Sequence, residues 1–176
     1  MTQKDELIEA MTDIAKDPKV VFVGYNVRHG SKANGTLIKV PEAQLIETPV
    51  AESLMAGIAL GLSLRGFTPI VYIERFDFIL NAIDVIVNHI DKIGPLSRGQ
   101  FKPKVIFRVV VGGMNMPLFT GPTHTQDFTR AMKQLVSFPV LTVHAIAKVK
   151  DLYRHAISSP ESQMLVEYKE NYTVTV

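Results

Sequence analysis

Hydrophobic residues along the chain form short continuous runs, separated by longer stretches in which apolar residues recur at helical spacing. The continuous runs predict buried strands over residues 20–23, 45–47, 69–73, 105–111, 140–143 and 164–168. The helical spacing between them predicts helices over residues 2–17, 51–65, 76–93, 127–135 and 149–158. Strands that alternate with helices are joined by parallel crossovers. We therefore predict an α/β fold, with a doubly wound, mostly parallel sheet and helices on both faces.

Residues that start and stop helices support this division. Thr2 and Asp5 have the spacing of a capping box for the first helix, and Asp127 could cap the fourth. Gly66 follows the second helix as a stop signal. Residues 25–41 form the longest irregular segment, and loops of that length in compact domains are often functional.

Length and composition narrow the class of protein. The 176 residues, 47% of them hydrophobic, predict one domain over 1–176. A formal net charge of +2 makes nucleic acid a weak candidate partner, and the lack of cysteine excludes disulfides and thiolate chemistry. The polar start does not resemble a secretory signal, and no apolar run approaches the roughly 18 residues of a membrane span. We expect a soluble cytoplasmic protein without a membrane partner.

A ligand site is expected at one edge of the predicted sheet, because open α/β sheets bind ligands beyond the carboxyl ends of their strands. The loops at that edge are those that follow Gly24, Glu47, Ile73 and Val111. The most unusual residues of these loops lie in the segments 48–52 and 121–126.

Glu52 has two interpretations. It can be a first-turn carboxylate that complements the helix dipole. Alternatively, the small residues Ala56, Gly57 and Gly61 let a second helix approach closely, which would bury Glu52 beside an interface. Burial favours the neutral form of a carboxyl group, which can then hold or pass a proton near neutral pH. The local pattern leaves both interpretations open.

His124 and the aromatic pair Phe76 and Phe78 are equally ambiguous. A histidine in a loop at the active edge can donate, accept or shuttle a proton, but it can also bond only to backbone. Phe76 and Phe78 follow a predicted strand, where core packing is the ordinary role of such residues.

Several common motifs are missing from the sequence. Gly112-Gly113 is too short for a phosphate cradle, and there is neither a Walker pattern nor a GxGxxG fingerprint. The chain also lacks a GxSxG nucleophile elbow and any His, Asp and Glu cluster with convincing metal spacing. No residues of this chain are therefore assigned to a metal.

Four sequence blocks occur in the order and at the separations typical of one known family. They are Glu47-Thr48-Pro49-Val50-Ala51-Glu52-Ser53 with Gly57-Ile58-Ala59-Leu60-Gly61, Phe76-Asp77-Phe78 with Ala82-Ile83-Asp84, Ser97-Arg98-Gly99-Gln100-Phe101, and Gly121-Pro122-Thr123-His124-Thr125-Gln126. Over residues 4–170 the chain resembles the beta subunit of pyruvate and branched-chain 2-oxoacid dehydrogenases. That resemblance implies the pyrimidine-binding domain of the transketolase-like thiamine-diphosphate superfamily.

The resemblance also implies roles for individual residues. Glu52 would hydrogen-bond the pyrimidine nitrogen of thiamine diphosphate, and Phe78 would stack on that ring. His124 would face the substrate, and Thr48 and Pro49 would fix the approach to Glu52. The substrate would be a 2-oxoacid or a ketose-like donor, and the chain would pair as a homodimer through residues 51–65.

Differences from the family matter as much as the matches. The family usually has an acidic residue where this chain has Tyr25, and a Pro and an Asn where this chain reads His144-Ala145-Ile146. These changes put the standard substrate and a structural cation in doubt. The chain lacks both the GDG…N magnesium-diphosphate motif and a C-terminal domain, so we expect a partner subunit to hold Mg²⁺ and the diphosphate. The alternative is a non-catalytic binding or regulatory module that keeps the fold and docks a related subunit.

Overall fold

The computed structural model, which describes residues 1–113, 121–144 and 148–175, is built on a sheet of six strands. All strand pairs are parallel, in the order β2-β1-β3-β4-β6-β5. The strands are β1 Val20–Gly24, β2 Leu45–Glu47, β3 Thr68–Ile73, β4 Ile106–Val111, β5 Val140–Thr142 and β6 Gln163–Tyr168. The chain runs from β1 to one side and then returns to the other, which confirms the doubly wound α/β fold.

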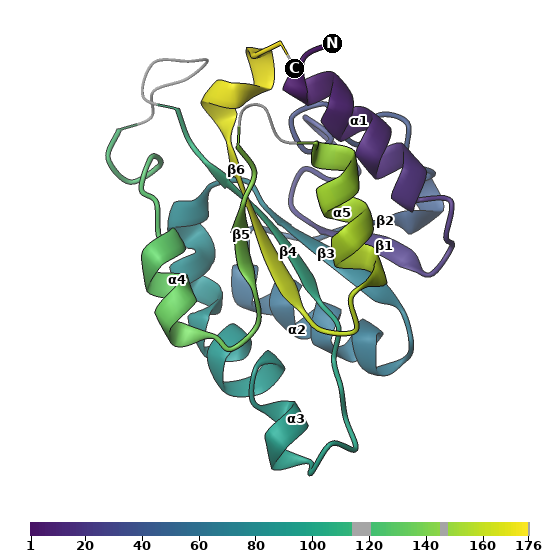
Figure 1. Ribbon diagram of the computed structural model, residues 1–176, viewed down its shortest axis with the longest axis vertical. Coiled ribbons are helices and arrows are strands. Elements are labelled where there is room, and N and C mark those ends of the chain that lie inside the picture. Colours follow the sequence, from purple (N-terminus) through teal and green to yellow (C-terminus); the bar gives the residue numbers. More distant parts are fainter. Residues whose placement is uncertain (114–120, 145–147, 176) are drawn as a thin grey trace.

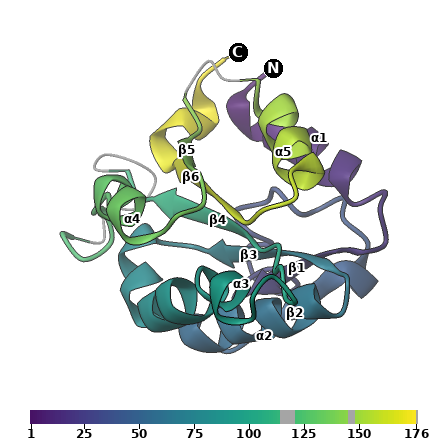
Figure 2. The same ribbon diagram turned by 60° about the horizontal axis from the view of Figure 1, so that its bottom comes forward.

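Helices cover both faces of the sheet (Figures 1 and 2). One face carries α1 (Gln3–Ile14) and α5 (Val149–Ser158); the other carries α2 (Glu52–Leu64), α3 (Ile93–Leu96) and α4 (Thr129–Leu135). Strand side chains alternate between two apolar cores, so Tyr72 packs toward α1 and α5 while Ile73 packs toward α2. None of the described helices is long and apolar enough to cross a membrane.

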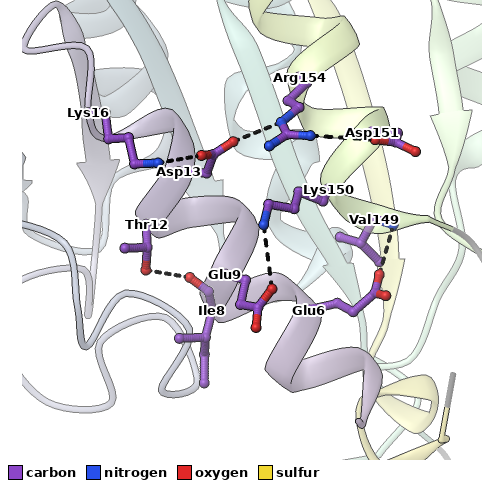
Figure 3. Close-up of polar contacts among 10 residues, drawn as sticks. All are labelled: Glu6, Ile8, Glu9, Thr12, Asp13, Lys16, Val149, Lys150, Asp151 and Arg154. Atoms are coloured by element: carbon purple, nitrogen blue, oxygen red, sulfur yellow. Dashed lines mark hydrogen bonds and ion pairs between the residues drawn. The ribbon is translucent and has the colours of Figure 1, made fainter.

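The helices α1 and α5 are joined by charged side chains along their exposed sides (Figure 3). Asp13 accepts hydrogen bonds from Lys16 and Arg154, each at 2.8 Å, and Lys150 pairs with Glu9 at 3.5 Å. The predicted capping box at the start of α1 is confirmed, because the side chains and backbone of Thr2 and Asp5 bond reciprocally.

Two helix predictions were wrong in detail. Residues 76–93 do not form one α-helix: a tightly wound 3-10 helix, η2 (Phe76–Ala82), leads into a wide π-helical segment, η3 (Val85–Ile90). The buried apolar residues explain the change of winding, since Phe76, Ile79 and Ala82 recur every three residues, and Ile86 and Ile90 follow at intervals of four.

Asp127 is the second correction. The helix α4 begins at Thr129 after Phe128, so Asp127 lies one residue before the capping position. Its carboxylate nevertheless accepts the backbone N–H of Thr129 at 2.8 Å, and it also accepts the hydroxyl of Tyr168 at 2.6 Å. Asp127 therefore links the start of α4 to the end of β6.

Candidate functional site

A cavity of about 240 Å³ lies where β1 and β3 end and α2 begins. This is the point where the strand order reverses, since β1 connects to β2 on one side and the chain returns to β3 on the other. The lining residues are Tyr25, Val50, Glu52, Met55, Tyr72, Ile73, Glu74, Arg75, Phe78 and His124. The structure thus brings Glu52, Phe78 and His124 together around one cavity.

Glu52 is the first residue of α2, and it is buried, with 5% of its surface exposed. Asn81 donates a hydrogen bond to Oε2 at 3.2 Å, and among the described residues none donates to Oε1. A carboxyl group in this position can offer its second oxygen to a ligand. Glu52 is thus both a carboxylate in the first turn of α2 and a buried side chain, so the two sequence interpretations are compatible.

Phe76 and Phe78 have different roles. Phe76 is fully buried and packs edge-on against Phe128, with ring centroids 6.1 Å apart, as the core interpretation predicted. Phe78 is only partly buried; it packs against the core on the α2 side of the sheet and also lines the cavity. Two aromatic rings only two positions apart at the start of η2 therefore have different surroundings, Phe76 the core and Phe78 the cavity.

His124 lies edge-on to Phe78, with ring centroids 5.2 Å apart and an interplanar angle of 85°. Its Nδ1 is 2.9 Å from the hydroxyl of Thr123, so that nitrogen has a local hydrogen-bond partner. The loop passes over the end of β4 so closely that a Cβ on Gly112 would lie 2.0 Å from the His124 carbonyl oxygen. Glycine at 112 therefore makes room for the loop that carries His124.

A carboxylate ties the Phe78 and His124 segments together. Asp77, next to Phe78, accepts hydrogen bonds from the backbone N–H and the side-chain amide of Gln126 at 3.2 and 2.9 Å. Its second oxygen is buried without a partner among the described residues. Asp77 consequently fixes the His124 loop relative to the wall of the cavity.

The long loop after β1 is held by a second carboxylate. Glu47, at the end of β2, accepts the backbone N–H groups of Asn26, Arg28 and His29 at 2.7 to 3.2 Å. Burial raises the pKa of Glu47, but these backbone donors outweigh it and lower the pKa below its usual value. With the loop held by these hydrogen bonds to Glu47, Tyr25 lines the cavity and is 41% exposed.

Thr48 and Pro49 do not line the cavity. Thr48 is buried, and its backbone N–H donates to the carbonyl of Gly24 at 3.0 Å, whereas Pro49 is exposed. Through this bond Thr48 joins the end of β2 to the end of β1, four residues before α2 begins at Glu52. Of the family difference at residues 144–146, only His144 lies within the described residues, and its carbonyl accepts the Gln3 side-chain amide at 2.7 Å.

A buried polar network lies below the cavity floor. Arg108 makes a two-point ion pair with Glu167 at 2.8 and 2.9 Å, and both side chains are fully buried. Tyr153 and Tyr172 donate to the same carboxylate, and Arg108 stacks over the Tyr72 ring at 5.3 Å. Burial raises the pKa of the Tyr72 phenol, which favours its neutral form.

Sequence reasoning missed Asn81, Glu74 and Arg75. Asn81 is 29 positions from Glu52 in sequence, and no local pattern signals such a contact. Glu74 and Arg75 do carry a signal, because they directly follow β3 at the carboxyl edge of the sheet. Within the described ranges, no cluster of three or more acidic residues and histidines could hold a metal ion.

The fold and the cavity define a class of protein: a parallel α/β domain whose cavity, at the carboxyl ends of the strands, is lined by an aromatic ring, a histidine and a buried carboxyl group. Residues 5–175 match the family model described as transketolase, pyrimidine binding domain, and the chain belongs to that family.

Individual relatives agree with this assignment. The chain is 28% identical to the mitochondrial beta subunit of the pyruvate dehydrogenase E1 component of Saccharomyces cerevisiae, over 99% of this chain and 50% of the relative. The corresponding beta subunit of Rickettsia conorii is also 28% identical, over 95% of this chain and 52% of the relative. The chain thus spans about half the length of the curated relatives it matches.

A solved structure shares the fold. The chain described as "Split gene transketolase, inactive beta4 tetramer" superposes with a TM-score of 0.76 at 17% identity, over 100% of this chain and 53% of that chain. This likeness supports the arrangement of the sheet and helices.

Proposed function

We propose that this chain supplies the aminopyrimidine half of a thiamine-diphosphate site, for decarboxylation or cleavage of a 2-oxoacid or ketose-like substrate. The observation that carries the proposal is the placement of Glu52 and Phe78 on one cavity, with the Glu52 Oε1 without a donor among the described residues. The family membership of residues 5–175 supports it.

The residues around the cavity fit half of such a cofactor. A planar ring needs an apolar face, which Phe78 offers, and a hydrogen-bond partner, which Glu52 offers. The volume of about 240 Å³ is below the roughly 300–1,000 Å³ of complete ligand pockets, in keeping with a site that a second polypeptide completes.

Each residue has a distinct chemical task in this proposal. When bound, thiamine diphosphate would supply the nucleophilic carbon, with Mg²⁺ and the diphosphate held by the partner subunit. Glu52 would hold and exchange a proton at the pyrimidine nitrogen through the hydrogen bond that its Oε1 can make there. Phe78 would orient the ring. His124 would meet the substrate and bind or move a proton there.

The helix α2 supports an additional proposal of self-association. Its outer side carries Leu54 and Leu64, exposed by 46% and 41%, beside Gly57 and Gly61, where an added Cβ would meet nothing within 4 Å. Ala56, which the sequence interpretation included in this face, is fully buried in the chain's own core. We propose a homodimer through the Leu54 side of α2, within a hetero-oligomer.

Tyr25 favours a second candidate, a non-catalytic module that docks a related subunit. It stands at the cavity where the family usually has an acidic residue. A non-catalytic protein that keeps the fold would tolerate tyrosine at this position. The presence of Glu52, Phe78 and His124 favours the catalytic proposal instead.

Calorimetry with thiamine diphosphate and Mg²⁺ separates these possibilities. The isolated chain is expected to bind weakly, because in the described residues it offers no metal cluster. A mixture with a diphosphate-domain subunit is expected to bind tightly and to require Mg²⁺. Tight, magnesium-dependent binding to the isolated chain would contradict a divided site. Assembly without any cofactor binding would favour the docking module.

A further inference from the structure

Two cationic side chains reach the carboxyl edge of the sheet on either side of β4. Ile73 of β3 pairs with Val109, and Val111 pairs with Tyr168 of β6. Arg75 and Lys169 therefore follow their strands at nearly the same height along the sheet. Between them β4 ends at Val111 and continues into Gly112, which has no side chain.

Arg75 extends across this edge from the cavity. It lines the cavity together with Glu52 and His124, and its Cδ would lie 3.4 Å from a Cβ placed on Gly112. Its Nη1 donates to the carbonyl of Glu74 at 2.8 Å. This bond uses one of the five N–H donors of the guanidinium group, so the other donors are available to a ligand.

Neither cation has an acidic partner in the described ranges. The ion pairs found there include no carboxylate within 4.0 Å of Arg75 or Lys169. The nearby Glu74 carboxylate accepts a hydrogen bond from Asn26 at 3.1 Å, and Lys169 instead sits 4.9 Å from the centre of the Tyr172 ring.

The pKa of Lys169 agrees with two nearby positive charges, on Arg75 and Lys169, that no carboxylate among the described residues neutralises. Burial, followed by repulsion from Arg75 and Lys4, lowers the pKa of Lys169 to about 8, against a smaller opposing effect of Glu74. Arg108 also repels it, but that guanidinium is paired with Glu167. An oxyanion between Arg75 and Lys169 would relieve this repulsion and gain charge-assisted hydrogen bonds.

We propose that Arg75 and Lys169 form an oxyanion subsite at the end of β4, which binds the carboxylate or phosphate of the substrate beside the Glu52 cavity. The assignment to a substrate rests on the proposed function. Arginine offers a planar fork that suits either group, and lysine adds a point charge. The family pattern did not single out either residue.

The test is a titration of the isotope-labelled chain with sodium phosphate and, separately, with sodium pyruvate at constant ionic strength. The Nε–Hε resonance of Arg75 and the Cε resonance of Lys169 are followed by NMR. Both are expected to shift saturably. Arg75→Gln should weaken binding about tenfold or more, as expected for loss of a charge-assisted pair, and Arg75→Lys should weaken it less. Arg130→Gln, an exposed arginine on α4, is the matched control and should change nothing.

The outcomes are separable. Tighter binding of phosphate indicates a phosphorylated substrate, and tighter binding of pyruvate indicates a 2-oxoacid; either supports the subsite. No saturable shift with either anion, or equal binding by wild type, Arg75→Gln and Lys169→Gln, would overturn it. If the anions bind but the assembled complex fails to bind thiamine diphosphate, the proposed function fails alone. If the complex binds the cofactor but no anion shifts Arg75, this subsite fails alone.

Discussion

Gly112 is the residue at which a single methyl group would disturb the site most. A Cβ there would lie 2.0 Å from the backbone carbonyl of His124, and a backbone atom cannot rotate away as a side chain can. Gly112→Ala should therefore displace the His124 loop and lower the free energy of unfolding by roughly 1–3 kcal/mol, the usual cost of overpacking. Urea unfolding and the His124 ring resonances measure the two effects.

A matched glycine gives the opposite expectation. Gly57 lies within α2, and an added Cβ there would meet nothing within 4 Å. Gly57→Ala should raise the free energy of unfolding by roughly 0.5–1 kcal/mol through helix propensity, measured in dilute solution where association is weak. Equal effects of the two substitutions would show that the contact between Gly112 and His124 is not made.

At the residue scale, the sequence alone left Glu52, Phe78 and His124 ambiguous. The family resemblance selected these three, and the structure places them on one cavity, although their chemical roles stay predictions. The clamp between Asp77 and Gln126 could not be predicted, because it joins residues 49 positions apart. Thr48 and Pro49 immediately precede α2 but are not among the residues that line the cavity, and their predicted role beside Glu52 stays a prediction.

At the element scale, the ion pairs between α1 and α5 predict a pH effect. Hydrogen bonds from Lys16 and then Arg154 lower the pKa of Asp13 from 3.8 to about 2. Because the pKa is lower in the folded state, the stabilisation is complete above about pH 4 and is lost as the pH falls through about 2. Asp13→Asn should cost a few tenths to about 1 kcal/mol at pH 6, the range for exposed pairs.

Urea unfolding of wild type and Asp13→Asn at several pH values checks this expectation. The difference between the two proteins should shrink as the pH approaches 2. Asp151→Asn, which removes only a 3.8 Å contact with Arg154, is the control and should have a smaller effect. If the difference in free energy of unfolding between wild type and Asp13→Asn grew as the pH fell, the proposed role of the Asp13 ion pairs would be contradicted.

The helix α2 predicts how the chain associates. Leu54 is 46% exposed on the outer side of α2, and Leu135 is 44% exposed on α4. Leu54→Glu should shift sedimentation toward the monomer, because it places a charge in the proposed contact, whereas Leu135→Glu should not. A wild-type chain that stays strictly monomeric at high concentration would contradict the proposed homodimer.

Elements with continuous or clear periodic patterns were predictable. Every strand was placed within one residue at each end, and α5 was placed at its observed bounds. The change of winding within residues 76–93 was not predictable. Apolar residues at intervals of three and then four have nearly the same spacing along the sequence as those of a single α-helix. Only contacts with the sheet and α2 reveal which turns are tight.

At the scale of the whole molecule, the chain covers about half of its curated relatives and 53% of the similar solved chain. The cavity has a volume of about 240 Å³, and Glu52 and Phe78 in its lining suit a planar ring. Under the proposed function, a partner subunit would complete the site to which this chain contributes Glu52 and Phe78.

The most direct test of this account follows proton exchange at the thiazolium carbon of thiamine diphosphate in the complex of this chain with a diphosphate-domain subunit. Glu52→Gln keeps the size of the side chain and one hydrogen bond, but it cannot carry the exchanged proton. We expect folding and assembly to remain, hydrogen–deuterium exchange to slow, and turnover to fall by roughly 10²–10⁴-fold. His124→Ala should lower turnover while it leaves the exchange rate unchanged. An unchanged exchange rate in Glu52→Gln would show that Glu52 does not hold the proton.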